Sequence, residues 1–147
     1  MNALQSNNKD FQMIGVPCNQ FHYQEPGANS TEIMNGITHV RPGFGFVPNF
    51  PLTEKIEVNG QNQDPLFTYL KKYCEPTSYK MFGMNWSPID SRDVRWNFEK
   101  FLIGRDGKPV KRYYILVDPT EPRVQDDITA ELKKSRHDGP VDIPVVG

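Results

Sequence analysis

Apolar and aromatic residues recur through the segment Trp96–Ile103, a pattern that is typical of a β-strand. The turn-forming run Gly104–Gly107 follows, and Val110–Val117 is again rich in β-branched and aromatic residues. This order predicts a β-hairpin. Trp96 and Asn97, at its start, both carry side-chain N–H donors, and buried donors need partners. We therefore expect the hairpin to point at an anionic or carbonyl-like group.

Other periodic segments predict one further strand and several helices. The apolar run Phe11–Val16 ends at Pro17 and predicts a buried strand. Asp64 is a good N-cap, and apolar residues at helical spacing after it predict an amphipathic helix that stops before Pro76. The remaining expected elements are a frayed helical end over 1–10, a helix from Asn29 or Ser30 to Met34, an edge segment over 54–58 and a helix over Val124–Lys134.

The order of these elements predicts an α/β fold with three layers, α/β/α. A parallel strand followed by an antiparallel hairpin and a helix forms the back half of a thioredoxin-like sheet. Its front half is expected to precede residue 1, so the N-terminal strands are expected to be missing. We expect a single domain over residues 1–138, incomplete at its N-terminus, and a disordered Pro/Gly-rich tail over 139–147.

Charge and hydropathy exclude several classes of function. The net charge is −1 and the charged residues are interspersed, so no basic stripe indicates nucleic acid binding. Apolar runs are far shorter than the ~18 residues that a membrane span requires, so no membrane partner is expected. The polar N-terminus lacks the apolar core of a signal peptide. Sequons at Asn29 and Asn85 weakly support a secretory origin.

The two cysteines and three histidines offer little catalytic or metal-binding chemistry. Cys18 follows the predicted strand, but no basic neighbour or helix N-terminus lowers its pKa, so we interpret it as structural. Cys74 forms no recognisable motif with it. His22, His39 and His137 supply no second pair of ligands at useful spacing, so we expect no metal site.

Three neutral donors remain as candidate site residues: Gln20, Trp96 and Asn97. None ionises usefully, so they are poor general bases. Together they would make a cradle for an anion such as a thiolate or selenolate, whose pKa their hydrogen bonds would lower. The alternative is that Trp96 belongs to the core and that both amides bond to backbone groups.

Six motifs resemble, in order and spacing, those of the glutathione peroxidase family. They are Gly15–Phe21 (GVPCNQF), Gln24–Gly27 (QEPG), Val40–Gly43 (VRPG), Phe46–Phe50 (FVPNF), Glu57–Gly60 (EVNG) and Arg95–Phe101 (RWNFEKF). The resemblance runs from about Phe11 to Lys134. It is strongest to the tetrameric animal type, in particular the secreted plasma and epididymal branch, with an N-terminal truncation.

This resemblance implies a peroxidase that reduces hydrogen peroxide and organic hydroperoxides and protects against oxidative stress. It implies that Gln20, Trp96 and Asn97 surround the catalytic cysteine or selenocysteine, and that Arg41 binds the carboxylates of glutathione. The oxidised nucleophile is reset by glutathione or another thiol, a co-substrate, and no cofactor is implied. In the family the nucleophile precedes the position of residue 1, so this chain is expected to lack it; Cys18 matches a different cysteine.

The resemblance also implies partners and a location. A full-length member would be a homo-oligomer, a tetramer, and secreted, with the cytoplasm as the alternative location. An Arg-Arg pair of some tetrameric members is Ile115-Leu116 here, which weakens a strong preference for glutathione. Two interpretations stay open: a shortened peroxidase, or a non-catalytic isoform that acts as a structural or regulatory partner of full-length subunits.

Overall fold

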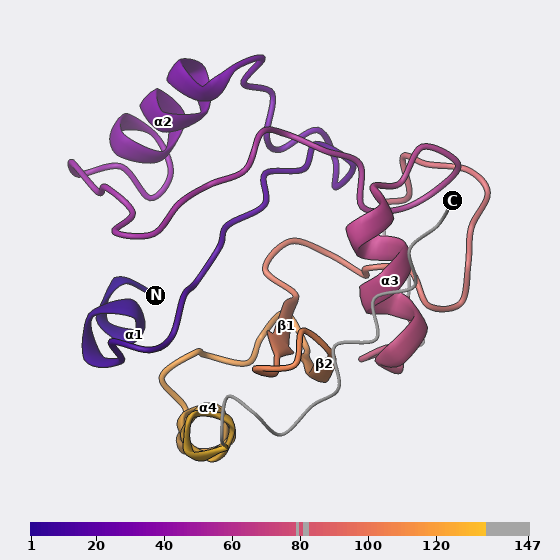
Figure 1. Ribbon diagram of the computed structural model, residues 1–147. Helices are drawn as coiled ribbons and strands as arrows, with labels where there is room; N and C mark the ends of the chain where they lie inside the picture. Colours follow the sequence, from indigo (N-terminus) through magenta and orange to yellow (C-terminus); the bar gives the residue numbers. More distant parts are fainter. Residues whose placement is uncertain (79, 81–82, 135–147) are drawn as a thin grey trace, which may run out of the picture.

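The computed structural model describes residues 1–78, 80 and 83–134 (Figure 1). Its helices are α1 (Asn2–Asn7), α2 (Ser30–His39), α3 (Pro65–Tyr73) and α4 (Pro122–Lys133), and its strands are β1 (Lys100–Ile103) and β2 (Pro109–Tyr113). The expected tail over 139–147, and residues 135–138 of the expected domain, lie outside the described residues. Within those residues, none of the helices is long and apolar enough to cross a membrane.

The predicted hairpin is confirmed, with shorter strands than the sequence suggested. β1 and β2 pair antiparallel, and the register shifts at a bulge between Leu102 and Ile103. The turn closes through a hydrogen bond from the Gly104 N–H to the Lys108 carbonyl at 2.8 Å. Residues 96–99 do not belong to β1, because Phe98 adopts a left-handed φ of 63° that interrupts an extended chain. Trp96 and Asn97 therefore lie on a turn before the strand.

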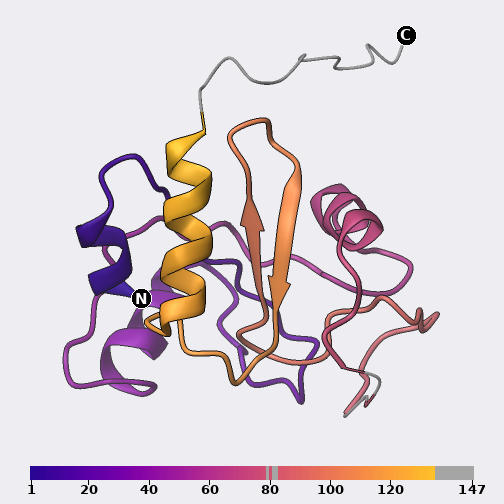
Figure 2. The same ribbon diagram turned by 90° about the horizontal axis from the view of Figure 1, so that it is seen from below.

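The hairpin separates two helical layers, as the expected α/β/α arrangement requires. Leu102 belongs to a core cluster with Val124 and Ile128 of α4. Its neighbour Phe101 points to the opposite face, where its ring meets that of Phe67 on α3 edge-on with centroids 6.1 Å apart. Figure 2 shows the hairpin with α4 on one side and α3 on the other. Successive residues of β1 thus face two separate cores.

The strand expected over Phe11–Val16 is not formed. The segment is extended, but its only ladder contact is an isolated parallel bridge between Gly15 and Leu52. Gly15 exchanges backbone hydrogen bonds with Pro51 and Thr53, each 2.9 Å long, along one edge of the segment. No described segment pairs with its other edge, so the ladder that defines a strand is absent. The edge segment expected over 54–58 likewise contains no strand.

Helices α2 and α3 begin at side-chain N-caps, Asn29 and Asp64. The Asp64 carboxylate accepts a hydrogen bond from the Leu66 N–H at 2.8 Å, and Pro65 opens α3, as predicted. α2 extends to His39, five residues beyond the expected end at Met34, because no proline or left-handed residue stops it earlier. α4 begins at Pro122, two residues earlier than expected, since proline is tolerated in the first turn of a helix.

Replacing Asp64 with alanine should lower the free energy of unfolding by about 1 kcal/mol, because it removes the N-cap of α3. Asp126→Ala makes the same change at an exposed position of α4 whose side chain has no hydrogen bond within the described residues, and should shift stability by less than about 0.5 kcal/mol. Urea unfolding of both variants measures this difference. Equal losses in the two variants would contradict the cap.

Candidate functional site

The predicted donors lie on two loops that touch through aromatic rings. Gln20 follows the extended segment 11–17, whereas Trp96 and Asn97 occupy the turn before β1. The Phe21 ring, which is buried, lies 5.9 Å from the Trp96 ring between centroids, and His22 meets Trp96 edge-on at 4.9 Å. The structure therefore brings the two predicted halves of the site against each other.

The buried Gln20 side chain is bound to backbone groups. Its Oε1 accepts hydrogen bonds from the N–H groups of Val58 and Asn59 at 2.9 and 3.0 Å, and its Nε2 donates to the Asn59 carbonyl at 2.8 Å. These contacts fix the orientation of the amide, because a flipped amide would place N–H groups against N–H groups. One of its two N–H donors is thus engaged with the chain itself.

Asn97 and Trp96 differ in how their donors are used. The Asn97 amide donates to Oε1 of Gln24 at 2.7 Å. The indole N–H of the half-buried Trp96 has no hydrogen bond to any residue that the structure describes. Of the three predicted side chains, Trp96 is the one whose donor makes no hydrogen bond to a described residue, whereas each amide uses one of its two N–H groups.

A cavity of about 2290 Å³ adjoins these residues. Its lining residues include Trp96, Asn97, Arg41 and Cys18. Gln20 is buried and is not one of them. The Arg41 guanidinium makes no ion pair or hydrogen bond within residues 1–78, 80 and 83–134. The structure therefore brings three of the four predicted site residues to one cavity and places the fourth beneath its surface.

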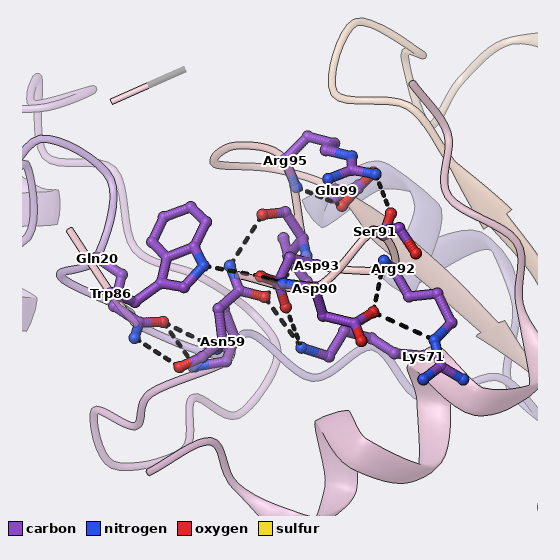
Figure 3. Close-up of polar contacts among 12 residues, drawn as sticks. Gln20, Asn59, Lys71, Trp86, Asp90, Ser91, Arg92, Asp93, Arg95 and Glu99 are labelled. Carbon is purple, nitrogen blue, oxygen red and sulfur yellow. Dashed lines mark hydrogen bonds and ion pairs between the residues drawn. The ribbon is translucent and has the colours of Figure 1, made fainter. Parts of the chain in front are cut away.

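A buried polar network supports the Gln20 loop from behind (Figure 3). Asn59, which is fully buried, donates to the Val94 carbonyl at 2.9 Å and accepts from the Val94 N–H at 2.8 Å. Lys71 of α3 donates to Oδ1 of both Asn59 and Asp93, at 3.1 and 2.8 Å. Burial lowers the pKa of Lys71, and its hydrogen bond to Asp93 opposes that shift. The network ties the Gln20 loop to the chain that leads to Trp96.

A second cluster anchors the turn that carries Trp96. The Arg95 N–H donates to Oε2 of Glu99 at 3.0 Å, so the two ends of the turn are linked. Glu99 also pairs with Arg112 of β2 at 2.8 Å, and both side chains are at most 1% exposed. Figure 3 shows Arg95 and Glu99 side by side next to the first network. Ion pairs buried in this way fix the turn relative to the hairpin.

These supporting residues were missed from the sequence. Asn59 and Gly60 lie in one of the motifs that carry the resemblance, but no chemical role could be derived for them. Gly60 has a φ of +80°, and a Cβ there would lie 3.0 Å from the Ser87 carbonyl oxygen, so the turn requires glycine. Lys71 looked like an ordinary polar position of an amphipathic helix. The one usable signal in the sequence was the dipeptide Asn59-Gly60, which is typical of a turn.

The buried Cys18 thiol is not activated as a nucleophile. Burial raises the pKa of its thiol, and the thiol lies 3.6 Å from Oε1 of Gln20. Burial also raises the pKa of Cys74, which is likewise buried. A raised pKa disfavours the thiolate that attacks peroxides. Among the residues that the structure describes, no group of three or more His, Cys, Asp or Glu residues could hold a metal ion.

Replacing Lys71 with methionine should lower the free energy of unfolding by about 3 kcal/mol, since it leaves the Asp93 carboxylate buried without its cation. Lys72→Met makes the same change at the exposed neighbouring position, and should cost less than about 1 kcal/mol. Urea unfolding compares the two, and similar costs would show that the buried pair is not what holds these loops.

Comparisons with known proteins agree on one family. A family model described as "Glutathione peroxidase" matches residues 1–71. The chain is 52% identical over 120 residues to "Glutathione peroxidase 6" of Mus musculus, covering 78% of this chain and 53% of that protein. It is 47% identical over 140 residues to the "Epididymal secretory glutathione peroxidase" of Sus scrofa, covering 91% of this chain and 62% of that protein.

Solved structures give the same answer for the fold. The crystal structure of Trgpx in apo form superposes with a TM-score of 0.59 and 31% identity, covering 90% of this chain and 68% of that chain. T. cruzi GPX1 gives a TM-score of 0.54 and 26% identity, covering 89% and 65%. The chain spans about half to three fifths of the length of the curated relatives it matches.

Proposed function

The chain belongs to the glutathione peroxidase family and has its thioredoxin-like fold, and from that premise we propose that it carries the donor side of a hydroperoxide-reducing site. Trp96 supports this proposal most directly. Its indole N–H is unengaged within the described residues, Trp96 is one of the residues that line the cavity, and its ring contacts those of Phe21 and His22.

In the proposed reaction, a thiolate or selenolate attacks the outer oxygen of a hydroperoxide. The O–O bond breaks, the nucleophile becomes a sulfenic or selenenic acid, and the alcohol or water leaves after gaining a proton. Two glutathione molecules then reduce the oxidised nucleophile and form a disulfide and water. The Trp96 N–H would stabilise the anionic nucleophile by donating to it, because hydrogen bonds to the charged form lower its pKa.

Gln20 and Asn97 contribute differently to this proposed cradle. Gln20 keeps one amide N–H free of the Asn59 carbonyl, so it can donate without releasing its loop. Asn97 is held by Gln24 and would donate through its second N–H or exchange that partner. The proposal therefore places Trp96 first among the catalytic donors, with Gln20 and Asn97 beside it.

Arg41 is the proposed residue for glutathione. It lies just beyond α2 at the cavity, exposed and without an ion pair within the described residues. A planar guanidinium binds a carboxylate through two parallel hydrogen bonds, and glutathione carries two carboxylates. This geometry suits a weakly bound co-substrate that approaches from solvent.

We also propose that the protein acts outside the cell as a homo-oligomer. The epididymal secretory relative supports the first point by its name. An apolar patch supports the second: Val40, Phe44 and Val47, on one loop, are 78%, 106% and 56% exposed. Exposed apolar side chains gathered in this way are typical of surfaces that another subunit covers.

We propose that the nucleophile is a cysteine or selenocysteine that is not among these 147 residues, because both cysteines present are buried with raised pKa values. The chain should therefore consume hydroperoxide, in an NADPH-coupled glutathione assay, no faster than its Cys18→Ser variant. Rapid turnover that disappears in the variant would contradict this and make Cys18 the nucleophile.

Replacing Trp96 with phenylalanine should slow peroxide reduction about 10²–10³-fold, the usual cost of losing one donor to a developing charge. The measurement uses a chimera in which an amino-terminal glutathione peroxidase segment that carries the nucleophile is joined to Met1. Trp86→Phe is the matched control: the Trp86 N–H is engaged with Oδ2 of Asp93 at 2.8 Å, so its loss should lower stability rather than the peroxide rate. Equal rates for Trp96→Phe and the parent chimera would overturn the donor role.

A further inference from the structure

The two glycosylation sequons of the chain lie in very different surroundings. The first, Asn29-Ser30-Thr31, opens α2, and all residues over 28–32 are exposed. Figure 1 shows α2 at the edge of the molecule, away from the β1–β2 hairpin. The second, Asn85-Trp86-Ser87, precedes the hairpin, and its asparagine is partly buried. An N-linked glycan is bulky and hydrated, so it needs an asparagine whose amide nitrogen faces solvent.

The hydrogen bonds of Asn29 leave its amide nitrogen available. Asn29 is the N-cap of α2 and caps it through oxygen, because Oδ1 accepts from the Glu32 N–H at 3.0 Å. Nδ2 makes one long contact of 3.4 Å to Oε1 of Glu32, whose Oε2 accepts from the Ala28 N–H at 2.7 Å. Nδ2 carries two N–H groups, and a glycan replaces only one of them. The modified side chain therefore keeps its capping oxygen and one donor.

The amide of Asn85 is placed in the opposite way. Its Nδ2 is buried and has no hydrogen bond to any residue that the structure describes. The neighbouring Trp86 ring is fixed by its hydrogen bond to Asp93 at 2.8 Å and by its edge-on contact with Phe21. A sugar on Asn85 would have to draw the amide nitrogen into solvent, which would disturb the chain beside Trp86.

We propose that Asn29 is an N-glycosylation site of this protein and that Asn85 stays unmodified. In the transfer, Nδ2 of Asn29 forms a bond to the anomeric carbon of an oligosaccharide carried on a lipid pyrophosphate. The bond from that carbon to the pyrophosphate oxygen breaks, the lipid pyrophosphate leaves, and the amide loses one proton. The proposal rests on the extracellular location proposed above, because this transfer takes place in the secretory pathway.

The position of Asn29 is compatible with the other surfaces proposed above. α2 separates it from the apolar patch of Val40, Phe44 and Val47, which follows the other end of this helix. A helix of 10 residues is about 15 Å long. Asn29 is also not among the residues that line the cavity of the candidate site. A glycan there is attached away from both the apolar patch and the cavity.

The test attaches a cleavable signal peptide to Met1 and translates the full chain with microsomes, so that entry into the secretory pathway does not depend on the native location. The protease-protected chain is compared by gel mobility before and after peptide-N-glycosidase F. This enzyme converts a glycosylated asparagine to aspartate, which peptide mass spectrometry then locates. We expect one glycan per chain, with the conversion at Asn29 alone. A protected chain without a glycan, or a glycan at Asn85, would overturn the proposal.

Two alanine substitutions form a matched pair that leaves both asparagines in place. Thr31→Ala and Ser87→Ala each remove the hydroxyl that a sequon requires, and both side chains are exposed, so both variants should fold alike. Thr31→Ala should abolish the glycan, whereas Ser87→Ala should leave it unchanged. The reverse outcome would assign the glycan to Asn85.

Thermal unfolding tests whether the glycan leaves the cap of α2 intact. The glycosylated chain is compared with the same chain made in the bacterial cytosol, and the two melting temperatures should agree, because Oδ1 of Asn29 still accepts from the Glu32 N–H. A melting temperature lower by a few degrees in the glycosylated form would indicate a lost N-cap and contradict this geometry. These readouts involve no peroxide or thiol. A missing glycan in microsomes would contradict the site, whereas a native protein retained inside the cell would contradict the proposed location.

Discussion

The constraint on which the rest of the structure depends is the satisfaction of buried backbone groups in two loops. Residues 58–59 and 93–95 are neither helix nor strand, yet all of them are buried. Asn59 resolves this conflict, because its side chain bonds both the N–H and the carbonyl of Val94. Lys71 then neutralises Asp93 at a depth where a lone carboxylate would be costly. Without these contacts neither loop would have a fixed path.

That constraint reaches the candidate site through a short chain of bonds. The backbone of Asn59 holds the amide of Gln20, and the chain beyond Val94 runs directly into the turn of Trp96. Asp93 also orients Trp86, whose ring meets that of Phe21 at 5.6 Å. Movement at Asn59 would therefore reach both loops of the site together. The network therefore positions both Gln20 and Trp96, which are 76 positions apart in the sequence.

Features that depend on residues close together in the sequence could be predicted, whereas features that depend on contacts between distant residues could not. The α3 cap at Asp64 and the turn after Gly104 depend on neighbours within a few residues, and both are confirmed. The strand expected over Phe11–Val16 was wrong, because an apolar run specifies burial but a strand also needs a paired ladder. For the site, residue type showed only which side chains carry N–H donors. It could not reveal that the Gln20 amide bonds residues 58–59, since those partners lie 38 and 39 positions away.

The division of the core explains why the cavity and the donor site are connected. One cluster surrounds Leu102 and α4, and the other surrounds Phe21 and α3. β1 is the element common to both, because Phe101 and Leu102 face opposite ways. The cavity lies along β1 and reaches the turn of Trp96, so whatever occupies it would touch both clusters and the unengaged indole.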